Sequence, residues 1–135
     1  GNTVVCDYEF TMPLEQQRGE KKEAAIYYSP ICLQITGDLV RNVTVTGNTL
    51  TGGAKGIHIT ALPQKEMQSA KPQDGTPQNL TVVGNTVTGQ KFTALECSGN
   101  GIPMRGIVAN NLFADYPTGG WDIGGTGLVE HNNVK

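Results

Sequence analysis

Four polar residues recur at one position of four short segments, and their types could carry out acid–base chemistry. The segments are AAIYYS (24–29), GIHIT (56–60), TALECS (93–98) and GGWDIG (119–124). In each, the polar residue lies between two larger apolar ones, as in a strand whose alternate side chains point to opposite faces. The pattern therefore predicts that one polar side chain per segment points outward: Tyr27, His58, Glu96 and Asp122.

The chemistry of this column depends on which of its members lie side by side. If the strands pair in register, Glu96 and Asp122 lie about 5 Å apart at Cβ. Two carboxylates at that distance should couple, with one pKa raised, and could form a retaining glycosidase pair. A lyase would instead use His58 or Tyr27 to remove the C5 proton beside a uronate carboxylate. The alternative interpretation is ordinary surface, because outward strand positions are normally polar.

Small residues flank the polar column and suggest a trough for an extended sugar chain. Two residues before each polar position lie Ala25, Gly56, Ala94 and Gly120, and two residues after lie Ser29, Thr60, Ser98 and Gly124. We expect Tyr27, Thr60 and Ser98 to contact substrate. Lys65, Lys71 and Lys55 could meet an acidic polysaccharide, the first two from a long loop at 62–78 that could border the site. Solvated surface charge is the alternative for these lysines.

Internal repeats indicate the elements that position this column. NVTVTGNTLTG (42–52) returns as NLTVVGNTVTG (79–89), with weaker copies at 106–113 and 127–134. Aligning the turns gives a column of Asn2, Asn48, Asn85, Asn111 and Asn132, at intervals of 46, 37, 26 and 21 residues. Repeats of this length indicate a solenoid. We expect about four coils of three strands, each strand pairing in parallel with its counterpart one coil away.

The repeat alignment also assigns the core and the turns. Asn tolerates the left-handed turn conformation, and stacked amides can form a hydrogen-bonded ladder. The predicted inward stacks are Val43 and Leu80; Val45, Val82, Val108 and Val129; and Val4, Leu50, Val87, Phe113 and Val134. The predicted outward column of the second sheet is Thr44, Thr81, Ile107 and Leu128, with Leu112 outward after the Asn turn.

Composition excludes several classes of protein. The net charge is −2 with both signs scattered, which gives no electrostatic case for a nucleic-acid or anionic-membrane partner. No apolar run is long enough to span a bilayer as a helix. The three cysteines, Cys6, Cys32 and Cys97, are odd in number and lack metal spacing, so neither a disulfide framework nor a metal site is expected. We expect no cofactor, since Ca²⁺ would have no supporting motif.

The words VTVTGNTLTG and LTVVGNTVTG, with the Asn column and the GIHIT strand, resemble the repeat of the pectin-lyase-like superfamily. The resemblance covers nearly the whole chain apart from insertions at about 11–23 and 62–77. It implies a right-handed parallel β-helix, polysaccharide as the usual ligand on this sheet and its loops, and an extracellular, cell-surface or virion location. The superfamily includes polysaccharide lyases, glycoside hydrolases and phage tailspikes. This chain lacks its Asp-Asp pair and its Arg-x-Pro-x-x-Arg motif.

These observations predict an all-β chain, a right-handed single-stranded parallel β-helix forming one domain over 1–135, as part of a longer solenoid. The predicted function is recognition of a polysaccharide. If the chain is an enzyme, we expect it to cleave that polysaccharide by a lyase or glycoside hydrolase mechanism. The alternative is a non-enzymatic structural or adhesive segment of a phage fibre or cell-surface protein. Outward aliphatic residues and the lack of an amphipathic cap after HNNVK predict flanking coils or a homo-oligomer.

Overall fold

A computed structural model describes residues 1–6, 31–37, 40–61, 77–98, 104–117, 121–122 and 127–135. These residues form strands and turns and contain no helix, which confirms the all-β prediction for this part of the chain. The strands are β1 (Thr3–Cys6), β2 (Ile31–Gly37), β3 (Arg41–Thr46), β4 (Thr49–Gly52), β5 (Lys55–Ala61), β6 (Gln78–Val83), β7 (Thr86–Thr88), β8 (Thr93–Ser98), β9 (Arg105–Ala109), β10 (Leu112–Ala114), β11 (Trp121–Asp122) and β12 (Leu128–His131). The predicted insertions lie outside the described residues, apart from Pro77.

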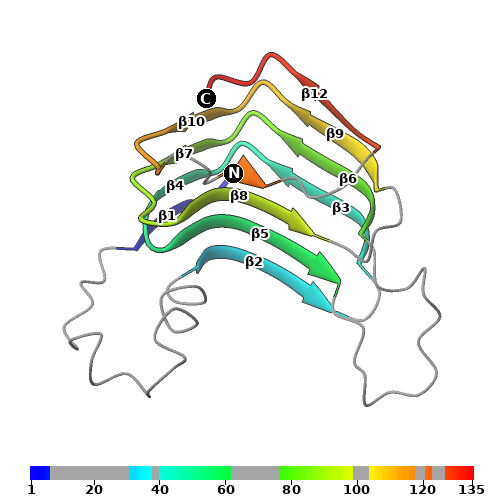
Figure 1. The fold of residues 1–135 in the computed structure, drawn as a ribbon, viewed down its shortest axis with the longest axis horizontal. Coiled ribbons are helices and arrows are strands. Elements are labelled where there is room, and N and C mark those ends of the chain that lie inside the picture. The colour runs from blue at the N-terminus through cyan, green and yellow to red at the C-terminus, as the bar shows by residue number, and fades with distance from the viewer. Residues whose placement is uncertain (7–30, 38–39, 62–76, 99–103, 118–120, 123–126) are drawn as a thin grey trace.

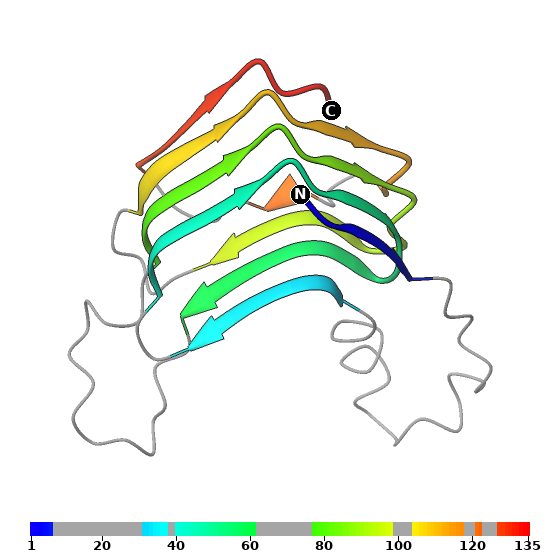
Figure 2. The ribbon, with the colours of Figure 1, turned by 180° about the vertical axis from the view of Figure 1, so that it is seen from behind.

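The twelve strands form three parallel sheets of four strands each. Sheet A has the order β1-β4-β7-β10, sheet B β11-β8-β5-β2 and sheet C β12-β9-β6-β3. The chain visits sheets B, C and A in turn, and we call each such passage a coil. In Figures 1 and 2 the strands of each sheet are stacked in parallel, as the predicted solenoid requires. The parallel pairing is confirmed.

The first coil begins later in the chain than expected. We expected its first strand at 24–29, but β2 (Ile31–Gly37) is the strand that pairs with β5. In this pairing Gln34 lies opposite His58, so the predicted alignment of Tyr27 with His58 is wrong. Tyr27 itself lies outside the described residues. β2 has the same alternation as GIHIT, with Leu33 and Ile35 packed against the core on either side of Gln34.

Columns of aliphatic side chains fill the space between the sheets. The register places Leu50, Val87 and Phe113 at equivalent positions of sheet A, and all three are completely buried. The other buried columns are Val45, Val82 and Val108 in sheet C, and Ile57 with Leu95 and Ile59 with Cys97 in sheet B. Complete burial of such a side chain contributes roughly 1.5–3 kcal/mol. These stacks, all predicted from the alternation, set the register of the three sheets.

The predicted asparagine ladder is present and runs along the turn between sheets C and A. The Nδ2 of Asn48 donates to Asn85 Oδ1, and the Nδ2 of Asn85 donates to Asn111 Oδ1, both at 2.9 Å. Asn2 extends the ladder at one end, donating to Asn48 Oδ1 at 3.3 Å. The same oxygens also accept backbone N–H groups, such as that of Asn48 bound to Asn85 Oδ1 at 3.0 Å. The ladder is therefore bonded to both side chains and backbone.

The conformational reason that we gave for the asparagines was wrong. The left-handed residue in each turn is the one before the ladder position, with φ of 64° at Gly47, 67° at Gly84, 54° at Asn110 and 50° at Asn132. The asparagine that follows is selected by its amide, which both donates and accepts within the ladder. Each turn therefore contains a Gly or Asn that adopts the left-handed conformation, followed by the Asn whose amide forms the ladder.

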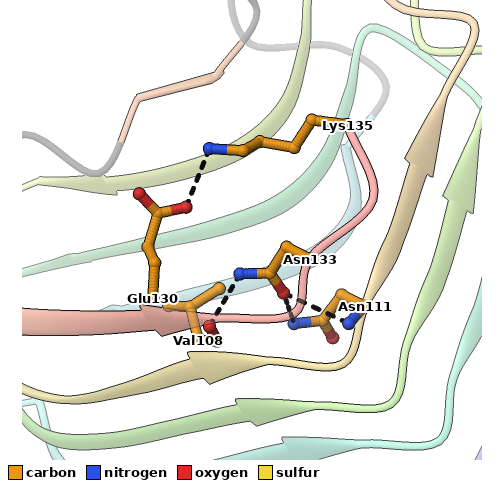
Figure 3. Close-up of polar contacts among 5 residues, drawn as sticks. All are labelled: Val108, Asn111, Glu130, Asn133 and Lys135. Carbon is orange, nitrogen blue, oxygen red and sulfur yellow. Dashed lines mark hydrogen bonds and ion pairs between the residues drawn. The ribbon is translucent and has the colours of Figure 1, made fainter.

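The last coil is shifted by one residue from its predicted alignment. Asn133, and not Asn132, continues the ladder, accepting a bond of 2.9 Å from Asn111 Nδ2 and donating to the Val108 carbonyl at 2.7 Å (Figure 3). A shift of one residue turns each strand side chain to the other face. Val129 accordingly pairs with Ile107 and is 62% exposed, so its predicted inward position is wrong.

The same shift corrects the remaining residues of the last coil. Leu128 pairs with Gly106 and packs against the core, contrary to its predicted outward position. Val134 lies opposite Leu112, not Phe113, and is exposed. Glu130 takes the place in register with buried Val108, and its carboxylate accepts a bond of 2.9 Å from Lys135 Nζ (Figure 3). The last strand thus presents an ion pair where the earlier coils present aliphatic side chains.

Candidate functional site

The polar column of sheet B is positioned by the pairing of β5 with β8 and of β8 with β11. His58 lies opposite Glu96, and Glu96 lies opposite Asp122. The predicted alignment of these three residues is confirmed at the level of the backbone, and Gln34 continues the column on β2. Each of His58 and Glu96 lies between two core residues, so both project from the face opposite to the core.

Three side chains from these strands meet in one ionic cluster, formed by Lys55, His58 and Glu96. Lys55 Nζ lies 2.5 Å from Glu96 Oε2, and His58 Nε2 lies 3.2 Å from Glu96 Oε1. Each oxygen of the Glu96 carboxylate therefore contacts a different side chain. The Lys55 side chain is completely buried, and that of Glu96 is 14% exposed. Glu96 is the member of the cluster that solvent reaches most.

The alternation of side chains along β5 is interrupted at Gly56, next to Lys55. Strict alternation would give Lys55 the same direction as Ile57, which lies in the core. The pairing register is unbroken, joining Lys55 to Thr93 and Ile57 to Leu95, yet Lys55 Nζ contacts Glu96, which projects away from the core. A Cβ at Gly56 would lie 2.3 Å from Val87 Cγ1 and 2.5 Å from the Ala94 carbonyl oxygen. Gly56 is therefore turned toward the core, and this close approach requires glycine.

The inward direction of Gly56 and Ala94 removes the predicted trough of small residues. Gly56 approaches buried Val87, and Ala94 belongs to the buried hydrophobic core. Neither residue lines the outer face, so their predicted outward position is wrong. The expectation that the column faces solvent is also wrong for His58, which is 4% exposed, and Thr60 beside it, an expected substrate contact, is only 5% exposed. The alternation identified the face from which they project but not their burial.

The charge on Glu96 is fixed by its two partners. The hydrogen bond from His58 lowers the pKa of the Glu96 carboxyl to about 2, with the hydrogen bond and charge of Lys55 acting in the same direction against burial. We expected one carboxylate of the column to have a raised pKa. Glu96 shows the opposite shift, because its nearest partners are a histidine and a lysine. Glu96 is thus ionised at neutral pH and cannot serve as the general acid of a glycosidase.

His58 contains an unused polar atom. Its Nε2 contacts Glu96, while its buried Nδ1 finds no hydrogen-bond partner among the described residues. When Nε2–H donates to the carboxylate, a neutral imidazole carries its lone pair on Nδ1. A buried polar atom without a partner costs about 1–3 kcal/mol. This nitrogen could therefore accept a hydrogen bond from a ligand or take up a proton.

Several predicted site residues cannot be placed. Tyr27 and Lys65 lie outside the described residues, as do the side chains of Ser98 and Asp122, whose backbones pair with Thr60 and Glu96. Lys55, for which we considered contact with an acidic polysaccharide or a solvated surface position, is buried against Glu96 instead. Gln34 was missed, although its setting in ICLQITG matches that of His58 in GIHIT. The same alternation could have found it.

Within the described ranges, no three or more His, Cys, Asp and Glu side chains are grouped so as to hold a metal ion. No helix there is long and apolar enough to cross a membrane. Comparisons of the chain with protein-family models, with curated proteins and with solved structures gave no match.

Proposed function

We propose that the chain forms part of a right-handed parallel β-helix, related to the pectin-lyase-like superfamily, that binds a polysaccharide on the outer face of sheet B. The regular passage through sheets B, C and A supports the helix. The asparagine ladder supports it too, because it requires equivalent turns to stack along one axis. Both features agree with the sequence words that carry the resemblance.

The observation that carries the binding proposal is the Nδ1 of His58, which has no hydrogen-bond partner among the described residues and lies in a cluster with an ionised Glu96 and the Lys55 ammonium. Sugar hydroxyl groups both donate and accept hydrogen bonds. The Glu96 carboxylate, whose side chain is 14% exposed, can accept a hydrogen bond from one hydroxyl, and a hydroxyl that enters the buried cluster can donate another to Nδ1. On the first coil the exposed Gln34, bonded to Thr36 Oγ1 at 3.1 Å, extends the polar face along the stack. An extended chain lying along the coils would meet these groups in succession.

For cleavage, we infer elimination with His58 as the base. An ionised Glu96 could serve hydrolysis only as nucleophile or base, so the general acid would have to come from another residue. In elimination, His58 Nδ1 takes the C5 proton of a uronate. The C5–H electron pair forms the C4–C5 double bond, the bond from C4 to the leaving oxygen breaks, and that oxygen takes up the proton that the imidazole removed. Glu96 orients the imidazole by accepting from Nε2.

The test is a glycan array on the purified chain, followed by an ultraviolet assay for unsaturated uronate ends and a reducing-end assay. We expect binding of an acidic polysaccharide, and loss of binding or product formation in His58→Gln. The matched control is Thr44→Ala, an exposed threonine on sheet C, which should behave as the original chain. Folded protein that binds no glycan, or a His58→Gln variant with unchanged binding and turnover, would refute the site.

The second candidate function is a structural or adhesive segment of a phage fibre or cell-surface protein. It is favoured by exposed aliphatic side chains paired on adjacent coils: Ile107 with Val129, and Leu112 with Val134. Neighbouring exposed aliphatics suggest a surface that associates. Under this proposal the exposed aliphatic side chains are covered either by a second copy of the chain or by flanking coils, and the chain binds no sugar. Analytical ultracentrifugation gives the oligomeric state, and the glycan array gives the binding of sugar. A monomer that binds glycan supports only the first candidate.

Both candidates fit an extracellular, cell-surface or virion location, which we infer from the resemblance alone. Acidic polysaccharides and adhesive partners occur outside cells. Detection of the protein outside the cells that produce it, with an antibody raised against this chain, would test this location, and detection inside those cells alone would contradict it.

A further inference from the structure

Two cysteines far apart in the sequence meet where sheets A and B begin. Cys6 ends β1 and Cys32 lies in β2, 26 residues later. The Cys32 thiol donates to Cys6 Sγ, and the two sulfurs are 3.1 Å apart. Both side chains are half-buried, so a small molecule can reach them. The third cysteine, Cys97, is completely buried in the core.

We propose that Cys6 and Cys32 are a redox pair that closes to a disulfide when the chain meets a low-molecular-weight disulfide such as oxidised glutathione. The bond would join the first strand of sheet A to the edge strand of sheet B. It would also close the chain over residues 6–32. Such a bond constrains the unfolded chain and so stabilises the folded one.

The surroundings of the two sulfurs set the order of the exchange. Burial, then the hydrogen bond to Cys6 and its charge, raises the pKa of the Cys32 thiol to about 12. Its sulfur also lies 3.5 Å from the Gly52 carbonyl oxygen, a further acceptor for the S–H. Because the thiolate is the attacking form, Cys32 is a poor first nucleophile. Cys6, which accepts the Cys32 hydrogen bond, attacks first.

The exchange balances in two steps. Cys6 thiolate attacks one sulfur of oxidised glutathione, forming a mixed disulfide and releasing one glutathione thiolate. Cys32 then attacks the Cys6 sulfur, breaking the mixed disulfide and releasing the second glutathione, with its proton passing to the thiolate that leaves. Two protein thiols are oxidised and one glutathione disulfide is reduced to two thiols. The contact between the two sulfurs makes the second step intramolecular.

The test is equilibration of the folded, reduced chain with glutathione buffers of varied oxidation, then acid quenching, alkylation and peptide mapping. We expect a Cys6–Cys32 link, a mass lower by two hydrogens, and alkylated Cys97. The folded chain should be half-oxidised in a buffer at least about tenfold more reducing than the one that half-oxidises the denatured chain. The oxidised form should melt on the order of 5–10 °C higher than the reduced form.

The variants sharpen the result. Cys97→Ala should still lose two hydrogens, whereas Cys6→Ser and Cys32→Ser should not. The mapping of the unsubstituted chain decides the matter even where a variant fails to fold. A link that includes Cys97, a lasting glutathione adduct on Cys6, or folded chain that stays fully reduced at the most oxidising ratio would each overturn the proposal.

Discussion

The described residues contain two polar columns that run along the stack of coils, and the columns differ in how completely their atoms are hydrogen-bonded. In the asparagine ladder the same residue type recurs, and each amide in the middle coils bonds to its neighbours above and below. In the polar column of sheet B the residue type changes from Gln34 to His58 to Glu96. That column holds a buried nitrogen without a partner among the described residues.

The difference separates structural from functional polarity. A fully bonded buried network stabilises one arrangement, because any slip of register leaves several polar atoms unpaired. The ladder can repeat because an amide both donates and accepts, so identical residues complement one another. Imidazole, carboxylate and ammonium complement one another only in specific pairs. A column of these groups can therefore contain a hydrogen-bond donor or acceptor that has no partner in the column and is available to a ligand. Substitutions in the two columns should therefore have different consequences.

The largest effect is expected from Asn85→Leu in the ladder. The change removes the acceptor for the N–H and Nδ2 of Asn48, and the donor to Asn111 Oδ1 and to the Val45 carbonyl. All of these groups are buried, so we expect the free energy of unfolding to fall by roughly 3–5 kcal/mol. Chemical denaturation followed by circular dichroism measures it. Thr86→Ala, at the half-buried next position, is the control and should cost less than about 1 kcal/mol.

The next effect is expected from Glu96→Gln in the ionic cluster. The amide leaves the buried Lys55 ammonium without its carboxylate, which should lower the free energy of unfolding by about 2–4 kcal/mol. Adding Lys55→Met should restore part of the loss, because an apolar side chain of similar size needs no counter-charge. Gln34→Ala, exposed in the same column, should change stability by less than about 0.5 kcal/mol. If the double variant is as unstable as the single one, the ion pair is not the cause.

The ionic cluster should also make stability depend on pH in the acid range, whereas the ladder should not. The Glu96 pKa is about 2 when folded and near its ordinary 4.5 when unfolded, so the folded state favours the carboxylate. This stabilisation is complete above about pH 5 and is lost as the pH falls from 4.5 toward 2. Its size is on the order of 2 kcal/mol once solvent screening of the partly exposed carboxylate is allowed for. Denaturation at several pH values should show a smaller loss in Glu96→Gln, and an equal loss would contradict the assignment.

Sequence reasoning placed the middle of the structure well because its signals are periodic. The alternation identified the core columns, and the repeated turn identified Asn48, Asn85 and Asn111 as one ladder. The first coil was misplaced because two segments, 24–29 and 31–37, both have strand alternation. The last coil was misplaced because Asn110-Asn111 and Asn132-Asn133 are doublets that can be aligned in more than one way.

The candidate site was harder to predict because burial and interruptions of the alternation are not periodic. Alternation showed that His58 projects away from the core, but it carries no information on what lies above that face. Alternation gives Lys55 the direction of Ile57, and only the contact between the side chains of Lys55 and Glu96 shows that the lysine reaches this carboxylate. The pKa of Glu96 is lowered first by His58 and then by Lys55, and the alternation predicts neither contact.

The smallest expected effect, and the sharpest test of the ladder's register, comes from the doublet in the last coil. Asn132 is exposed with φ of 50°, a conformation that glycine adopts freely, so Asn132→Gly should change the free energy of unfolding by less than about 0.5 kcal/mol. Asn133→Ala removes the acceptor for Asn111 and the donor to the Val108 carbonyl, and should cost about 1–2 kcal/mol. The cost is lower than for Asn85 because Asn133 is only half-buried. Under the alternative register the order of the two effects would reverse, because Asn132 would then carry the ladder bonds. Urea denaturation of the two variants in parallel therefore decides which asparagine belongs to the ladder.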